Sequence, residues 1–118
     1  MYILNLMVKY SPALDRTFSA LADPHRREIL DRLAAGPVSI SELAAPLDMS
    51  LPGVLKHVHA LEAARLVQTH KRGRTRWCQL SRRPLDQAGN WIDQRRDRWE
   101  RQLDQFVRHI DKTKGAKR

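Results

Sequence analysis

The side chains best suited to bind an anion are gathered in one short stretch of the sequence. Lys71, Arg72, Arg74 and Arg76 fall within six positions, and no acidic residue lies among them. Ammonium and guanidinium groups clustered in this way bind phosphate oxygens, and arginine is favoured by the negative potential of a DNA minor groove. A loop that is charged only for solubility usually carries both signs. We therefore favour phosphate contact over a merely solvated loop.

Metal, thiol and catalytic chemistry have weaker support. His57, His59 and His70 form no recognisable set of metal ligands, and Cys78 is the single cysteine, which excludes an intramolecular disulfide. Arg76 could lower the pKa of that thiol and make it redox-active, but one cysteine in a strand is more often a packed residue. There is no Ser/His/Asp set, glycine-rich phosphate loop or paired-carboxylate pocket. We expect no catalytic residue, no metal and no cofactor.

The charge of the chain points to a polyanionic partner. The 118 residues carry a formal net charge of +9. Residues 50–83 hold eight Lys/Arg and one acidic residue, whereas residues 1–49 are net −1 and residues 84–118 are net +3. The excess is therefore concentrated in the central third, as is typical of a nucleic-acid-binding surface.

The length predicts a single domain. We divide it into a head at about 12–83, a helix at 84–112 and a basic tail at 113–118. Met1–Val8 is apolar but too short to span a membrane, and it lacks the features of a signal peptide. We therefore expect a cytoplasmic protein without membrane contact. Either Met1 or Met7 could be the true start.

Helix signals predict four helices before the basic stretch, at about 12–21, 24–35, 40–47 and 51–63. Asp23, Ser39 and Ser50 each stand where an N-cap is expected, and Glu42 completes a capping-box spacing with Ser39. The third and fourth helices are short and separated by about three residues, which is typical of a helix-turn-helix. Residues 66–70 and 75–80 alternate on both sides of a basic, glycine-containing tip and predict a β-hairpin. This order predicts an α+β, mostly α, winged helix-turn-helix with a two-stranded wing.

The fourth helix has one face suited to a DNA groove. Val58 and Leu61 fall within about 40° of Val54 on a helical wheel, and the three residues predict the buried stripe. The opposite face carries no acid, as a helix in a major groove requires, although an ordinary solvated face is the alternative. His57 lies at the edge of the core, where packing or phosphate contact is expected. The predicted DNA-binding residues are Ser50, Pro52, Gly53, Lys56, His57, His59, Lys71, Arg72, Arg74 and Arg76.

The last helix is expected to associate with a second copy. Its large apolar residues fall within about 40° of one line, and their spacing resembles a heptad seam. A stripe of that length is longer than one small core can cover, and homodimerisation would bury it. The predicted dimer interface comprises Leu14, Phe18, Leu85, Ile92, Trp99, Leu103, Phe106 and Ile110.

Several stretches together resemble the ArsR/SmtB family of bacterial repressors. Residues 21–30 read LADPHRREIL, 42–44 ELA, 49–58 MSLPGVLKHV and 60–67 ALEAARLV, in the family's order and spacing. The resemblance spans roughly residues 17–80. It implies a homodimer that binds double-stranded DNA at an inverted-repeat operator, usually blocks transcription and often regulates its own gene.

The sequence departs from the metal-sensing members of that family. Arsenic sensors carry a cysteine pair on the third helix, but residues 42–47 here contain no thiol. Zinc and nickel sensors carry paired ligands on the final helix, but Asp104 and His109 lack the required partners. The resemblance therefore implies a metal-independent branch, and it leaves open whether a small-molecule inducer exists and what it is. A metal- or redox-responsive repressor and a DNA-binding module without sequence preference stay as alternatives.

Overall fold

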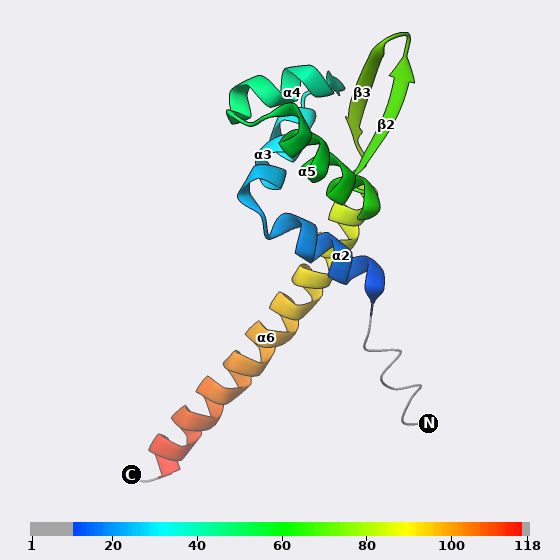
Figure 1. The fold of residues 1–118 in the computed structure, drawn as a ribbon. Coiled ribbons are helices and arrows are strands. Elements are labelled where there is room, and N and C mark those ends of the chain that lie inside the picture. The colour runs from blue at the N-terminus through cyan, green and yellow to red at the C-terminus, as the bar shows by residue number, and fades with distance from the viewer. Residues whose placement is uncertain (1–10, 117–118) are drawn as a thin grey trace. The chain divides into compact units, whose positions relative to one another are not determined.

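A computed structural model describes residues 11–116 of the chain (Figure 1). These residues form two units divided between Ala88 and Gly89. The first unit contains the helices, the sheet and the start of α6, and the second contains the rest of α6. The elements are α2 (Pro12–Leu21), α3 (Pro24–Leu33), β1 (Val38–Ser39), α4 (Ile40–Leu47), α5 (Leu51–Ala63), β2 (Val67–Arg72), β3 (Thr75–Leu80) and α6 (Arg83–Ala116). The apolar Met1–Val8 stretch and the question of the start residue lie outside the described residues.

Side-chain caps begin four of the described helices, and the sequence predicted three of these caps. The cap that it missed is Ser11, which accepts a hydrogen bond from the Leu14 N–H at the start of α2, at 3.3 Å. Asp23 accepts hydrogen bonds from two backbone N–H groups at the start of α3, at 2.8 and 3.3 Å. Ser39 at α4 and Ser50 at α5 each accept one from the third residue along, at 3.3 Å. Such caps satisfy donors that have no partner within the helix. The starts of α3, α4 and α5 are therefore fixed by local chemistry.

Two helix ends differ from the prediction. The helix α3 ends at Leu33 rather than near residue 35, and Gly36 then takes a φ of 143° that suits glycine. The helix α6 continues to Ala116, so most of the stretch expected as a basic tail is helical. Its 34 residues correspond to a helix of about 51 Å.

The sheet has a strand that the sequence analysis missed. The hairpin of β2 and β3 is confirmed, with Val67 opposite Leu80 and Arg72 opposite Thr75. Gly73, with a φ of 65°, begins the two-residue turn. The strand β1 pairs with the other edge of β3 and places Val38 opposite Cys78, so the sheet is three-stranded in the order β1-β3-β2. The wing was predicted as two-stranded because two residues are too few to show alternation.

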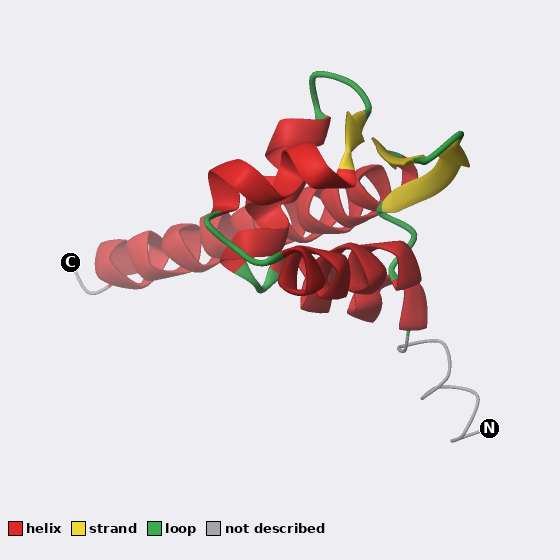
Figure 2. Ribbon diagram, turned by 45° about the horizontal axis from the view of Figure 1, so that its top comes forward, coloured by secondary structure: helices red, strands yellow, loops and turns green. Residues whose placement is uncertain are grey.

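The core of the first unit lies between the helices and the base of the sheet (Figure 2). Val54, Val58 and Leu61 are fully buried, which confirms the predicted inner face of α5. Ile29 of α3 and Leu43 of α4 are equally buried beside them. Each such side chain contributes on the order of 2 kcal/mol by leaving water. This packing fixes which face of α5 points outward.

Within residues 11–116, no helix is both long and apolar enough to cross a membrane.

Candidate nucleic-acid interface

The outward face of α5 carries the side chains that the sequence analysis assigned to DNA. Ser50, Pro52, Lys56 and His59 are exposed, and Gly53 is half-buried. The fully buried valines lie on the opposite side of the same helix. The core therefore holds this face toward solvent with small residues near the helix start and cationic or hydrogen-bonding residues beyond them.

The N-terminal end of α5 is also electrostatically suited to an anion. The first turn contains no acidic residue, and Ser50 occupies the cap with its hydroxyl. Free N–H groups and the helix dipole give this end a partial positive charge. The acidic residue of α5, Glu62, lies near the other end of the helix. The whole face toward the helix start therefore attracts negative charge.

The charged side chains of the wing are all positive. Lys71, Arg72 and Arg74 are exposed at and beside the turn, and Lys71 lies directly opposite Arg76 across the two strands. Like charges at facing positions of a hairpin destabilise it in isolation. A bound polyanion would relieve that repulsion. The hairpin extends away from the helices in Figure 1, so its tip is accessible.

A hydrogen-bonded chain ties the base of the wing to α5. Thr69 donates from Oγ1 to Glu62 Oε2 at 2.7 Å, and Arg76 donates from Nη1 to Thr69 Oγ1 at 3.2 Å. Arg76 is thus partly engaged within the protein, unlike the residues nearer the tip. The sequence analysis did not predict the contact between Glu62 and Thr69, because only the packing of β2 against α5 brings the two side chains together.

His57 lies apart from the exposed face of α5. It is half-buried, and its ring stacks on that of His25 with centroids 5.5 Å apart and planes at 27°. Its Nδ1 atom is buried and has no hydrogen-bond partner in the described structure. Asp23, His25 and His57 bring one ligand atom each within 4.8 Å of one another. The sequence analysis considered His57 without His25, because these residues are far apart in the chain.

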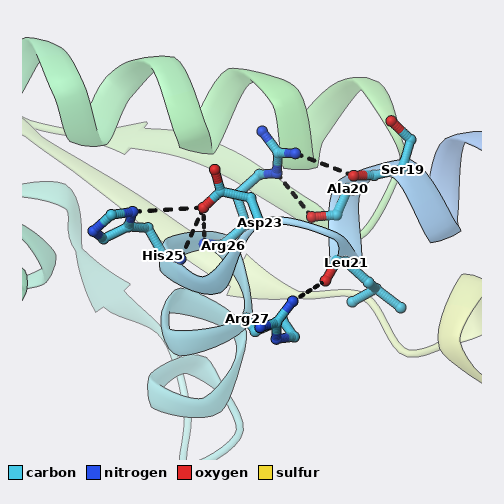
Figure 3. Close-up of polar contacts among 7 residues, drawn as sticks. All are labelled: Ser19, Ala20, Leu21, Asp23, His25, Arg26 and Arg27. Atoms are coloured by element: carbon cyan, nitrogen blue, oxygen red, sulfur yellow. Dashed lines mark hydrogen bonds and ion pairs between the residues drawn. The ribbon is translucent and has the colours of Figure 1, made fainter.

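Asp23 and the two arginines beside it bind different parts of the backbone (Figure 3). Arg26 donates from Nε to the carbonyl oxygen of Ala20 at 2.8 Å, and Arg27 donates from Nη1 to that of Leu21 at 2.6 Å. Both arginines therefore donate hydrogen bonds to carbonyl oxygens at the C-terminal end of α2, which have no partner within the helix. Burial alone would raise the pKa of Asp23, but backbone N–H donors and the charges of His57 and Arg26 together hold that pKa below its ordinary value.

Cys78 is packed in the core beneath the wing. Its side chain is fully buried. Burial, and then the negative charge of Glu62, raise the pKa of the thiol to about 11. A thiol that stays protonated is a poor nucleophile and a poor redox sensor. These properties favour the packing interpretation over the redox alternative.

The residues predicted for a dimer interface occupy different environments. Leu85 packs against the core of the first unit, while Leu14 is half-buried and Phe18 is 36% exposed. In the second unit, the apolar stripe of α6 is open to solvent. Trp99, Leu103 and Phe106 are 59, 61 and 60% exposed, and Ile92 and Ile110 are exposed to a lesser degree.

Comparison with known proteins gives consistent similarities. Residues 21–70 match a family model described as a helix-turn-helix domain. The chain is 39% identical to the HTH-type transcriptional regulator Rv2034 of Mycobacterium tuberculosis, over 82% of this chain and 88% of that protein. It is 29% identical to the transcriptional repressor SdpR of Bacillus subtilis, over 67% and 88%. A solved structure of an ArsR family transcriptional regulator matches 78% of this chain and 95% of its own, with 43% identity and a TM-score of 0.73.

Proposed function

The chain belongs to the ArsR family of winged helix-turn-helix transcriptional regulators, and from that premise we propose that it is a homodimeric repressor of an inverted-repeat operator. In this proposal each protomer inserts α5 into a major groove and lays its wing along the flanking backbone. The two protomers contact successive grooves on one side of the duplex.

One observation carries the proposal: α5 has an exposed face without acidic residues, and the wing in the same unit has charged side chains that are all cationic. Lys56 and His59 are the exposed donors of that face, and the valines behind them are fully buried. Helices that read a major groove need donors, little bulk and no negative charge. An ordinary solvated helix face of this length would usually include an acid.

The exposed side chains divide into two roles. We assign Lys56 and His59 to base edges, with Ser50 and Gly53 allowing the backbone to approach closely. Lys71, together with Arg72 and Arg74, is assigned to phosphate oxygens. Contacts of the first kind discriminate between sequences, whereas contacts of the second kind strengthen binding to any duplex.

Homodimerisation is proposed to bury the exposed stripe of α6. Trp99, Leu103 and Phe106 present large apolar surfaces about one helical turn apart, and a monomer would leave all three in water. A two-fold axis between paired helices would relate two copies of α5. The operator would then be an inverted repeat with half-sites about one helical turn, or roughly 10 base pairs, apart.

Selection of bound duplexes from random DNA by the purified protein tests this function. We expect enrichment of an inverted repeat. The protein should bind this repeat about a thousandfold more tightly than it binds a random duplex of the same length. Enrichment of no common sequence would contradict the proposal and favour a DNA-binding module without sequence preference. An inducer of unknown identity stays a prediction.

A further inference from the structure

Three side chains that commonly ligate metals meet where α3 begins and α5 passes behind it. Asp23 and His25 come from the start of α3, and His57 comes from the middle of α5. One ligand atom of each lies within 4.8 Å of the other two. His25 Nδ1 and Asp23 Oδ1 are closer still, at 3.6 Å. Two imidazoles and a carboxylate form a ligand set used by zinc and neighbouring transition metals.

The three side chains are near enough to share an ion once a histidine ring turns. Two ligands of a tetrahedral zinc ion, each bonded at about 2.0–2.2 Å, lie roughly 3.4 Å apart. His25 Nδ1 lies 3.6 Å from Asp23 Oδ1, close to this separation. Because Oδ1 already accepts two backbone N–H groups, Oδ2 of the same carboxylate is the oxygen that we assign to the ion. The rings of His25 and His57 are stacked, so one of them must turn out of the stack before both present a nitrogen to the same ion. The His25 side chain is 48% exposed and can turn in this way without disturbing the core.

The ligand atoms are also available. Both backbone hydrogen bonds to Asp23 reach Oδ1, and the guanidinium groups of Arg26 and Arg27 are directed to carbonyl oxygens of α2 (Figure 3). His57 Nδ1 is buried without a partner in the described structure. Buried ring nitrogens usually have one, so His57 has an unfilled bonding requirement and lies in the same cluster as the other two residues.

We propose that Asp23, His25 and His57 bind one divalent transition-metal ion, with zinc as the leading candidate and water in the fourth position. This site differs from the expectation of a metal-free protein that the sequence favoured. Because His57 is a residue of α5, the ion would join α5, the helix proposed to enter the major groove, to the start of α3. Any effect of that link on DNA affinity rests on the proposed function, but metal binding itself does not.

Titration of the metal-free full-length protein with Co²⁺ and Zn²⁺, in the absence of DNA, tests the site. We expect one ion per protomer, with the visible absorption of tetrahedral Co²⁺ that Zn²⁺ abolishes. His25→Asn and His57→Asn should each weaken Zn²⁺ binding at least about tenfold. His70→Asn and His109→Asn, which remove exposed histidines outside the cluster, should bind Zn²⁺ like the parent.

His25→Asn is the decisive variant, because His25 is exposed and its substitution should leave the fold intact. It stays informative even if circular dichroism shows that His57→Asn is unstable. Zn²⁺ affinity unchanged in His25→Asn overturns the proposal. An equal loss of Zn²⁺ affinity in His70→Asn also overturns it, as does the lack of any binding at about 10 µM Zn²⁺. Because no DNA is present, a failure here leaves the repressor proposal standing.

Discussion

At the scale of single residues, the wing cations and Lys56 are expected to contribute differently to DNA binding. Lys71→Ala and Arg74→Ala should weaken binding to every duplex and flatten the slope of log affinity against log salt by about 1 each, because each removes one phosphate contact. Fluorescence anisotropy at several salt concentrations measures the slope. Lys112→Ala, which removes an equal charge from α6, serves as the control. A slope equal to the parent's would remove the wing from the interface.

Lys56 should instead govern sequence preference. Lys56→Ala is expected to lower the preference for the selected operator over a random duplex by about tenfold, since one base-edge contact is worth roughly 1–3 kcal/mol of discrimination. Competition binding with both duplexes gives the ratio. If affinity for the two duplexes fell equally, Lys56 would be reassigned to a phosphate.

Cys78 should resist thiol reagents while the protein is folded. Burial favours the neutral thiol and raises its pKa from an ordinary 9.0 to about 11. Its contribution to stability is therefore present below pH 9 and declines as the pH rises toward 11. Reaction with a disulfide reagent at pH 8 should be slow in buffer and fast in guanidinium. Rapid labelling of the folded protein would revive the redox alternative.

The sequence predicted isolated residues better than it predicted clusters. Caps such as Asp23 and Ser50 were predictable because their partners lie within three residues. The stacking of His25 on His57 and the link from Glu62 through Thr69 to the wing were not, because each depends on how two distant segments pack. Helical periodicity and charge assigned the outward face of α5, but they could not show that His57 faces α3.

At the scale of elements, the cap of α5 gives a direct stability test. Ser50→Ala should lower the free energy of unfolding by about 1 kcal/mol, because the Gly53 N–H loses its acceptor. Urea denaturation at a fixed protein concentration, without DNA, measures the change. Ser41→Ala makes the same substitution at an exposed position inside α4 and should change stability by less than about 0.5 kcal/mol. Equal losses in the two variants would contradict the capping role.

Periodicity predicted the helices and the hairpin because each of these elements carries a repeating apolar face. The strand β1 escaped because its pairing with β3 is a long-range contact of two residues, Val38 and Ser39. The end of α6 was placed too early because its last residues form no core contacts that would mark a boundary. The helix in fact continues to Ala116.

At the scale of the whole molecule, the proposed dimer depends on the apolar stripe of α6. Trp99→Glu should convert the dimer into a monomer at micromolar concentration, since it places a charge among Leu103 and its neighbours. Sedimentation velocity reports the mass. Gln94→Glu adds the same charge on the opposite side of the helix and should stay dimeric. A Trp99→Glu protein that sedimented as a dimer would refute this seam.

The central claim is that two linked copies of α5 read one duplex. The most direct test is a stoichiometric anisotropy titration of the selected operator, with a random duplex as competitor. The account predicts two protomers per operator and a preference of about a thousandfold or more over random DNA, with the preference largely lost in monomeric Trp99→Glu. A single protomer bound per duplex, or equal affinity for both duplexes at matched salt, would contradict it.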